Sequence, residues 1–194
     1  VVERVGGQVF GVAGEVTNIK VTTREDLLML EGFLGRPVVP RVGFGRDRHP
    51  LVDGRALVIA GFTLGTDRGP LGHSDGDALC HAIADAMLGA CAGGDLGQLF
   101  PDSLEAHRGI DGLTVLSGAL ARVREKKLNV SSVDATIWIR EPRMAPHIEG
   151  IRRAVGKVLN VELERVSIKA KSGNGVDAIG QGIALEGEAV VVLV

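Results

Sequence analysis

From Val39 onward the chain alternates between strand-like and helix-like patterns, and this order constrains the fold more than any other feature of the sequence. We expect strands at residues 39–44, 56–64, 133–139, 166–170 and 189–194. We expect helices at residues 75–91, 112–127 and 145–159, the last of which has Pro146 near its first turn. Such alternation predicts an α/β fold.

The first 37 residues have a different pattern. A short β-type run at residues 14–23 ends at Thr23, which we expect to cap a helix that begins at Arg24. Pro37 and its neighbours then form a breaker and linker. Because a lone strand and helix cannot bury a core, we predict that residues 1–37 are the end of another domain and that residues 38–194 form a second one. The chain starts with Val, so we also expect that residue 1 is not the natural start.

Charge and composition argue against several functional classes. The chain has 22 Lys and Arg against 24 Asp and Glu, only 3% aromatic residues and no tyrosine, so we expect no nucleic-acid partner. No apolar run approaches the roughly 20 residues that span a bilayer, so we expect a soluble, cytoplasmic protein with no membrane partner. Cys80 and Cys91 are best explained as small buried thiols in a reducing compartment. A phosphorylated ligand would then need a focused site made from metals or helix N-termini.

Asp47 and His49 are two residues apart and follow the first expected strand. In an extended segment such side chains point the same way, so an oxygen and a nitrogen ligand converge. This pair suits Zn²⁺ or a similar cation. The same spacing also arises by chance in many proteins.

The stretch from His73 to Asp85 is the densest group of metal-binding residue types. Ser74 and Asp77 have the spacing of a capping box, so we expect the helix to begin there, with His73 and Ser74 at a natural phosphate seat. Asp77, His81 and Asp85 would share one helical face, on which His81 is a third metal ligand and either aspartate orients its ring. A solvated polar face stabilised by a His–Asp pair is the alternative explanation.

Asp95 lies among glycines in the segment 93–98. Glycines let a ligand approach the backbone closely, and the carboxylate can accept hydrogen bonds from sugar hydroxyls. A capped helix end followed by a turn explains the spacing equally well.

Together these motifs resemble the 2-C-methyl-D-erythritol 2,4-cyclodiphosphate synthase family. Asp-x-His, His-Ser-Asp-Gly-Asp with a second His, Gly-Asp-Leu-Gly-x-Leu-Phe-Pro-Asp, and Pro-Arg-Met before Pro-His occur in the family's order between Arg41 and the C-terminus. The resemblance implies an α+β two-layer fold with a mixed sheet and helices packed on one face. It also implies a homotrimer with active sites between subunits, a CDP-linked small-molecule substrate, Zn²⁺ or a similar divalent cation, and Mg²⁺ or Mn²⁺ held mainly through the diphosphate.

The resemblance also implies roles for individual residues. The metal ligands would be Asp47, His49 and His81, supported by Asp77 and Asp85. The catalytic residues would be His73, Ser74, Lys171 and Ser172, of which the first two contact phosphate. The substrate-binding residues would be Asp95, Gly97, Phe100, Asp102, Pro142, Arg143, Met144, Ala145 and Ala170, and those from Pro142 onward belong to a cytidine pocket.

The chain departs from the family pattern near its C-terminus. Asn174 replaces a metal-binding glutamate, and residues 175–182 form a shorter stretch than usual, in which Gln181 is nearest to the family's arginine. Losing a carboxylate should weaken Mg²⁺ binding, and Lys171 would supply positive charge to the diphosphate instead. These departures leave open a degenerate scaffold domain that binds metal or nucleotide. A second alternative is a zinc phosphohydrolase that uses the same three metal ligands to activate water.

Residues 14–27 are similar to the C-terminal end of the cytidylyltransferase that acts two steps earlier in the same pathway. Lys20 matches a substrate-binding lysine of that family, but its glycine-rich nucleotide loop is absent. The resemblance implies that the chain is the synthase half of a bifunctional protein whose covalently fused cytidylyltransferase domain is missing here.

Overall fold

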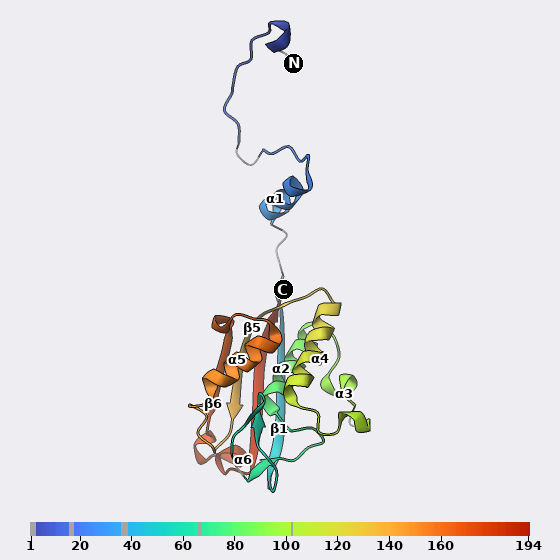
Figure 1. The fold of residues 1–194 in the computed structure, drawn as a ribbon. Coiled ribbons are helices and arrows are strands. Elements are labelled where there is room, and N and C mark those ends of the chain that lie inside the picture. Colours follow the sequence, from blue (N-terminus) through green and yellow to red (C-terminus); the bar gives the residue numbers. More distant parts are fainter. Residues whose placement is uncertain (1–2, 16–17, 36–38, 66, 102) are drawn as a thin grey trace. The chain divides into compact units, whose positions relative to one another are not determined.

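The computed structural model describes residues 3–15, 18–35, 39–65, 67–101 and 103–194. The chain divides into two compact units, Val1–Val39 and Pro40–Val194 (Figure 1). Residues 36–38, where we predicted the domain boundary, lie outside the described residues, as do Val16 and Thr17 of the expected β-type run.

The first unit contains the 3₁₀ helix η1 (Glu3–Val5) and the helix α1 (Arg24–Leu34). Thr23 caps α1 as predicted: its hydroxyl accepts from the Asp26 N–H at 3.2 Å, and the Asp26 carboxylate accepts from the Thr23 N–H at 2.8 Å. The described residues of the β-type run form no strand, because they have no neighbouring strand to pair with. No residue of α1 is buried within its unit.

The second unit is built on a five-stranded sheet in the order β4-β1-β7-β5-β6. Strands β5 and β6 are parallel, and the other neighbours are antiparallel, so the sheet is mixed as expected. The strands are β1 (Arg41–Asp53), β4 (Arg68–Pro70), β5 (Val130–Trp138), β6 (Val166–Lys171) and β7 (Ala184–Leu193). A separate hairpin joins β2 (Val58–Ile59) to β3 (Phe62–Thr63).

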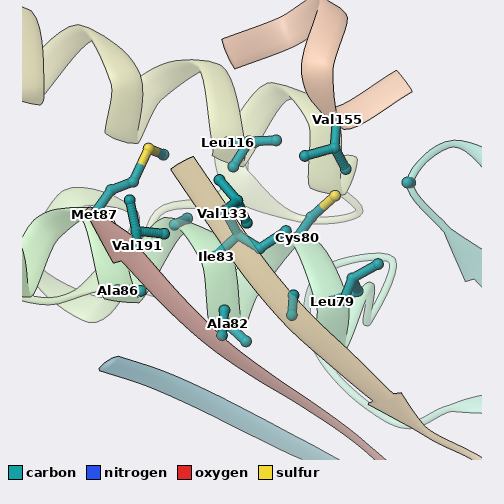
Figure 2. Close-up of a cluster of buried hydrophobic side chains, with 14 of the residues drawn as sticks. Leu79, Cys80, Ala82, Ile83, Ala86, Met87, Leu116, Val133, Val155 and Val191 are labelled. Carbon is teal, nitrogen blue, oxygen red and sulfur yellow. The ribbon is translucent and has the colours of Figure 1, made fainter. Parts of the chain in front are cut away.

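The main helices are α2 (Ala78–Ala90), α4 (Gly112–Glu125) and α5 (Ile148–Leu159), and Figure 1 shows them gathered over one side of the sheet. Buried side chains from these helices meet the sheet in one core, which contains Ile83, Leu116, Val133, Val155 and Val191 (Figure 2). The shorter elements are α3 (Leu96–Leu99), η2 (Glu105–His107), η3 (Leu163–Arg165), η4 (Gly173–Gly175) and α6 (Asp177–Gly180). The predicted α/β class with helices on one face is confirmed.

Helix α2 lies unusually close to the two strands beneath it. A Cβ atom on Gly43 or Gly45 of β1 would overlap the backbone of α2, and one on Gly187 of β7 would do the same. Since alternate residues of a strand face opposite sides, this contact also shows that Phe44 faces away from the helix layer.

Several predicted boundaries were wrong. Strand β1 continues to Asp53, because its whole length pairs with β7 or β4, so Asp47 and His49 lie within the strand. The expected strand at 56–64 is the β2–β3 hairpin, and the strand β4 was missed. Helix α2 begins at Ala78 rather than at residue 75, since the Asp77 side chain caps it.

Among the described residues, no helix is long and apolar enough to cross a membrane.

Candidate functional site

Asp47, His49 and His81 bring one potential ligand atom each to within 4.8 Å of one another. The first two come from β1, on the face that packs against α2, and His81 comes from the first turns of α2. Asp47 Oδ2 lies 2.8 Å from His49 Nε2 and 3.0 Å from His81 Nδ1. One carboxylate oxygen and two imidazole nitrogens are a donor set that a divalent cation such as Zn²⁺ accepts, so these residues fit such an ion.

The surroundings of the cluster fix the protonation of its members. Burial acts to raise the pKa of Asp47, but hydrogen bonds with both histidines outweigh it and hold the pKa well below its ordinary value. The hydrogen bond with Asp47 raises the pKa of His49. His49 Nδ1 lies 3.0 Å from the Leu71 carbonyl, which can only accept, so Nδ1 carries the proton and Nε2 is the atom turned toward the cluster.

The cluster forms part of the wall of a cavity of about 420 Å³, which we call the catalytic cavity. Predicted phosphate and sugar contacts share this wall with the predicted metal ligands. The lining residues are Arg46, Asp47, His49, Gly72, His73, Ser74, His81, Asp85, Asp95, Leu96, Gly97, Phe100, His107, Ile110 and Val115.

His73 and Ser74 line the catalytic cavity from a turn that precedes α2 rather than from its N-terminus. The Ser74 hydroxyl accepts from the Gly76 N–H at 3.1 Å, and the Asp75 carboxylate accepts from the Asp77 N–H at 3.0 Å. The predicted capping box between Ser74 and Asp77 is therefore wrong. The Ser74 hydroxyl bonds the Gly76 N–H and not the Asp77 N–H, which instead bonds the Asp75 carboxylate. A phosphate at this turn would be held by side chains more than by the helix end.

The two aspartates that we expected to orient His81 bond elsewhere in the described part of the structure. Asp77 accepts from the Ala60 N–H at 2.5 Å and from the Cys80 N–H at 3.0 Å, and burial raises its pKa to about 6. Asp85 accepts from the Leu96 N–H at 3.4 Å, and burial raises its pKa. Asp77 thus joins the hairpin to α2. Among the described residues, neither aspartate accepts a hydrogen bond from His81, so the predicted orienting role is not seen.

Asp95 caps α3, because it accepts from the Gln98 N–H at 2.8 Å and from the Gln98 side-chain amide at 3.1 Å. It also lines the catalytic cavity, together with Gly97 and Phe100. The expected capped helix end lies earlier, at Cys91, so Asp95 instead begins α3 and is also placed to bind a ligand. Asp102, the remaining predicted residue of this segment, lies outside the described residues.

The residues predicted to hold cytidine line a different cavity of about 400 Å³, which we call the nucleotide cavity. Its wall contains Lys171 and Ser172 from the end of β6, next to the turn that carries Asn174. Among the described residues, the two cavities share no lining residue. The nucleotide cavity is lined by Ile139, Arg140, Pro142, Arg143, Met144, Ala145, Ile148, Ala170, Lys171 and Ser172.

The sequence analysis missed two features of the site. Arg46 and Arg48 both pair with Glu186 of β7, with Arg46 Nε 2.7 Å from Glu186 Oε1, and Arg46 reaches the catalytic cavity. His107 lines the same cavity with its Nδ1 3.1 Å from the Pro101 carbonyl. A charged residue on each of two central strands was the available signal for the first, and nothing in the spacing pointed to the second.

A family model described as the YgbB family matches residues 40–194. A curated bifunctional enzyme IspD/IspF from Desulforudis audaxviator is 43% identical over 192 residues, which is 98% of this chain and 48% of that protein. The chain therefore spans about half the length of this relative. A 2-C-methyl-D-erythritol 2,4-cyclodiphosphate synthase from Rhodopirellula baltica is 44% identical over 158 residues, which is 81% of this chain and 95% of that protein.

Solved structures agree with the sequence relatives. A 2C-methyl-D-erythritol-2,4-cyclodiphosphate synthase in a CDP-bound form matches with a TM-score of 0.74 and 30% identity, over 79% of this chain and 100% of that one. The bifunctional IspDF from Campylobacter jejuni matches with a TM-score of 0.77 and 28% identity, over 98% of this chain and 52% of that one.

Proposed function

The chain belongs to the YgbB family, and on that premise we propose how the residues of its second unit carry out the reaction of a cyclodiphosphate synthase. The enzyme converts 4-diphosphocytidyl-2-C-methyl-D-erythritol 2-phosphate to 2-C-methyl-D-erythritol 2,4-cyclodiphosphate and CMP, in non-mevalonate isoprenoid precursor biosynthesis. The observation that carries the assignment of residues is the convergence of Asp47, His49 and His81 on the catalytic cavity.

The reaction is an intramolecular phosphoryl transfer. An oxygen of the 2-phosphate attacks the β-phosphorus of the CDP group, the bond from that phosphorus to the bridging oxygen breaks, and CMP leaves with the electron pair. No protein nucleophile is needed, so the protein contributes positioning and charge neutralisation.

We use the name metal cluster for the three side chains of Asp47, His49 and His81. They fit a divalent cation, which we propose to be Zn²⁺. When bound, such an ion neutralises charge on the diphosphate and polarises its oxygens. His73 and Ser74 would hold a phosphate from the neighbouring turn. Asp95 would bind the sugar-alcohol hydroxyls and so orient the attack.

The residues present fit a second cation poorly. Asn174, where the family has a glutamate, has no charge, and its amide oxygen lies 3.5 Å from the Ser172 hydroxyl. Mg²⁺ or Mn²⁺ would then be held mainly through the substrate diphosphate. We propose that Lys171, in the wall of the nucleotide cavity, supplies positive charge to the diphosphate there.

Two observations support a homotrimer with active sites between subunits. The metal cluster and the predicted cytidine residues line separate cavities of one chain, so a single substrate would bridge them most simply if one subunit supplied each. The sheet face opposite α2 also exposes the apolar side chains of Val42, Phe44 and Val190, which a neighbouring subunit would cover.

The first unit would contact the cytidylyltransferase domain of a longer bifunctional protein. Leu28, Phe33 and Leu34 of α1 are exposed within the unit, and the Desulforudis audaxviator relative matches this chain over almost its whole length. An amphipathic helix with uncovered apolar residues needs a partner surface, which the fused domain would provide.

The test is turnover of the CDP-linked 2-phosphate substrate by protein loaded with Zn²⁺ and supplied with Mg²⁺, followed by ³¹P NMR. We expect the cyclic diphosphate and CMP, and we expect His81→Ala to lose both bound metal and cyclic product. His147→Ala is the matched control, because His147 precedes α5 and its side chain makes no capping hydrogen bond.

Each of the other outcomes would point to a different function or site. Linear phosphate with CMP would show a hydrolase. Tight CDP binding with no turnover would show a degenerate scaffold. Full activity of His81→Ala would overturn the assigned metal site.

A further inference from the structure

A second large cavity, of about 590 Å³, adjoins the catalytic cavity, and we call it the anteroom. Both cavities are lined by Gly72, His73 and Ser74, so the two spaces meet at these residues. Gly72 lies against a predicted metal ligand, since a Cβ placed on it would be 3.3 Å from His49 Cε1. The anteroom is lined by Arg55, Leu71, Gly72, His73, Ser74, Glu105, Arg108 and Gly109.

Arg55 is a half-buried cation in this wall. Its Nη2 donates to the Ser74 carbonyl at 3.1 Å, which holds the guanidinium beside the turn that forms the boundary of the catalytic cavity. No ion pair joins Arg55 to a carboxylate among the described residues, whereas Arg46 and Arg48 pair with Glu186. A guanidinium has five N–H donors, so most of its donors and its whole charge remain for a ligand.

Arg108 adds a second positive charge on the other side of the anteroom. It pairs with Glu105 at 3.2 Å, but both side chains are largely exposed, so this ion pair is weak and exchangeable. Arg55 is the better placed of the two because it is less exposed and lies next to His73 and Ser74.

A phosphate held at this turn would be stabilised by an additional cation. The substrate has a diphosphate and a separate 2-phosphate, and the latter must be held in line for attack. The arginine in the wall of the catalytic cavity, Arg46, already pairs with Glu186, while Asp85 and Asp95 place carboxylates there. On the anteroom side Glu105 is paired with Arg108, and the planar guanidinium of Arg55 can bind two phosphate oxygens.

We propose that Arg55 binds the substrate's 2-phosphate at the boundary formed by His73 and Ser74, reaching it from the anteroom side, and that Arg108 strengthens this attraction. The proposal rests on the proposed function, since it assigns one of its substrate's two phosphate groups. It makes the anteroom part of the substrate site, and it makes Arg55 a residue that distinguishes the phosphorylated substrate from its precursor without the 2-phosphate.

The test compares two ligands that differ only in the 2-phosphate. We expect Arg55→Gln to lower kcat/KM for the substrate roughly ten- to hundred-fold, the range for loss of a charge-assisted hydrogen bond. The inhibition constant of 4-diphosphocytidyl-2-C-methyl-D-erythritol, which lacks that phosphate, should stay within about twofold by the same reasoning. Arg55→Lys should recover part of the loss, because it restores the charge without the planar fork.

Arg153→Gln is the control, because it removes an exposed charge that lines none of the three cavities described above. Equal weakening of both ligands by Arg55→Gln would show that Arg55 only supports the Ser74 turn, and no weakening of either would show that it is not used; both overturn the proposal. If wild-type protein makes no cyclic product, the proposed function fails separately, and dissociation constants of the two ligands from calorimetry then test Arg55 directly.

Discussion

At the scale of single residues, the negative charge of Asp47 determines the state of the metal cluster. It lies between two imidazoles, and their hydrogen bonds outweigh burial and keep its pKa low. The same contact raises the pKa of His49, while the Leu71 carbonyl fixes which ring nitrogen faces the cluster. A cation bound here would replace a proton shared among these groups, so its affinity falls as the pH is lowered.

Lys171 is the residue that we propose supplies positive charge to the diphosphate. It lines the nucleotide cavity, near the uncharged Asn174. If it neutralises the diphosphate, Lys171→Ala should lower kcat roughly tenfold or more, since a charged hydrogen bond is lost. We would measure steady-state kinetics of cyclic diphosphate formation across Mg²⁺ concentrations.

The control for Lys171 is Lys157→Ala, a change in the last turn of α5 that lies outside both cavities. A double variant with Asn174→Glu should regain activity at high Mg²⁺, because a carboxylate would restore a protein ligand for that ion. Near wild-type kcat for Lys171→Ala at all Mg²⁺ concentrations would rule out its role.

Residue chemistry with a local geometric rule could be predicted from the sequence. The period of two in a strand correctly places Asp47 and His49 together, and their atoms lie 2.8 Å apart. Arg55 was not predicted, because its position beside Ser74 depends on how a loop 19 residues away in sequence folds back. Spacing along the chain contains no information about such a contact.

At the scale of elements, the close contact between α2 and the sheet positions the metal cluster. Glycines at 43 and 45 let β1 approach the helix, and this approach brings His81 within reach of Asp47. The helix type and the approximate limits of α2, α4 and α5 were predictable from hydrophobic periodicity. The start of α2 was not, because Asp77 caps it while also bonding the β2–β3 hairpin, a tertiary contact.

This contact predicts opposite effects for two glycine substitutions. Gly45→Ala should lower the free energy of unfolding by roughly 2–3 kcal/mol and reduce metal affinity, because the added methyl overlaps the Ala82 carbonyl of α2 and pushes the helix from β1. Gly89→Ala, on the exposed side of α2 with no atom within 4 Å, should instead stabilise by about 0.5 kcal/mol.

Denaturant unfolding of both variants, together with a Zn²⁺ titration, would check this pair. Equal stability of Gly45→Ala and wild type would mean that the helix and β1 are less closely packed than the structure shows.

At the scale of the whole molecule, the two faces of the sheet have different roles. The helix layer covers one face and supplies His81. The other face carries an apolar group at its centre, formed by Val42 and Phe44 of β1 beside Val190 of β7, next to the ion pairs of Glu186. A sheet face that met water would be expected to carry polar side chains there, so the exposed apolar group is typical of a surface that another molecule covers.

Covering this face predicts that assembly and activity are lost together. Phe44 is 62% exposed in the single chain and lies opposite Val190, so Phe44→Glu would bury a charge without a partner at a subunit contact. We expect wild-type protein to have about three times the 20.3 kDa mass of one chain by light scattering, and Phe44→Glu to shift toward the single-chain mass. Turnover should fall in parallel, because the metal cluster and the nucleotide cavity would no longer meet across subunits.

Leu104→Glu, a similar change at a 51% exposed position away from this sheet face, should leave the mass unchanged. Full activity of wild-type protein at the single-chain mass would refute the shared site. The apolar face would then bind another partner.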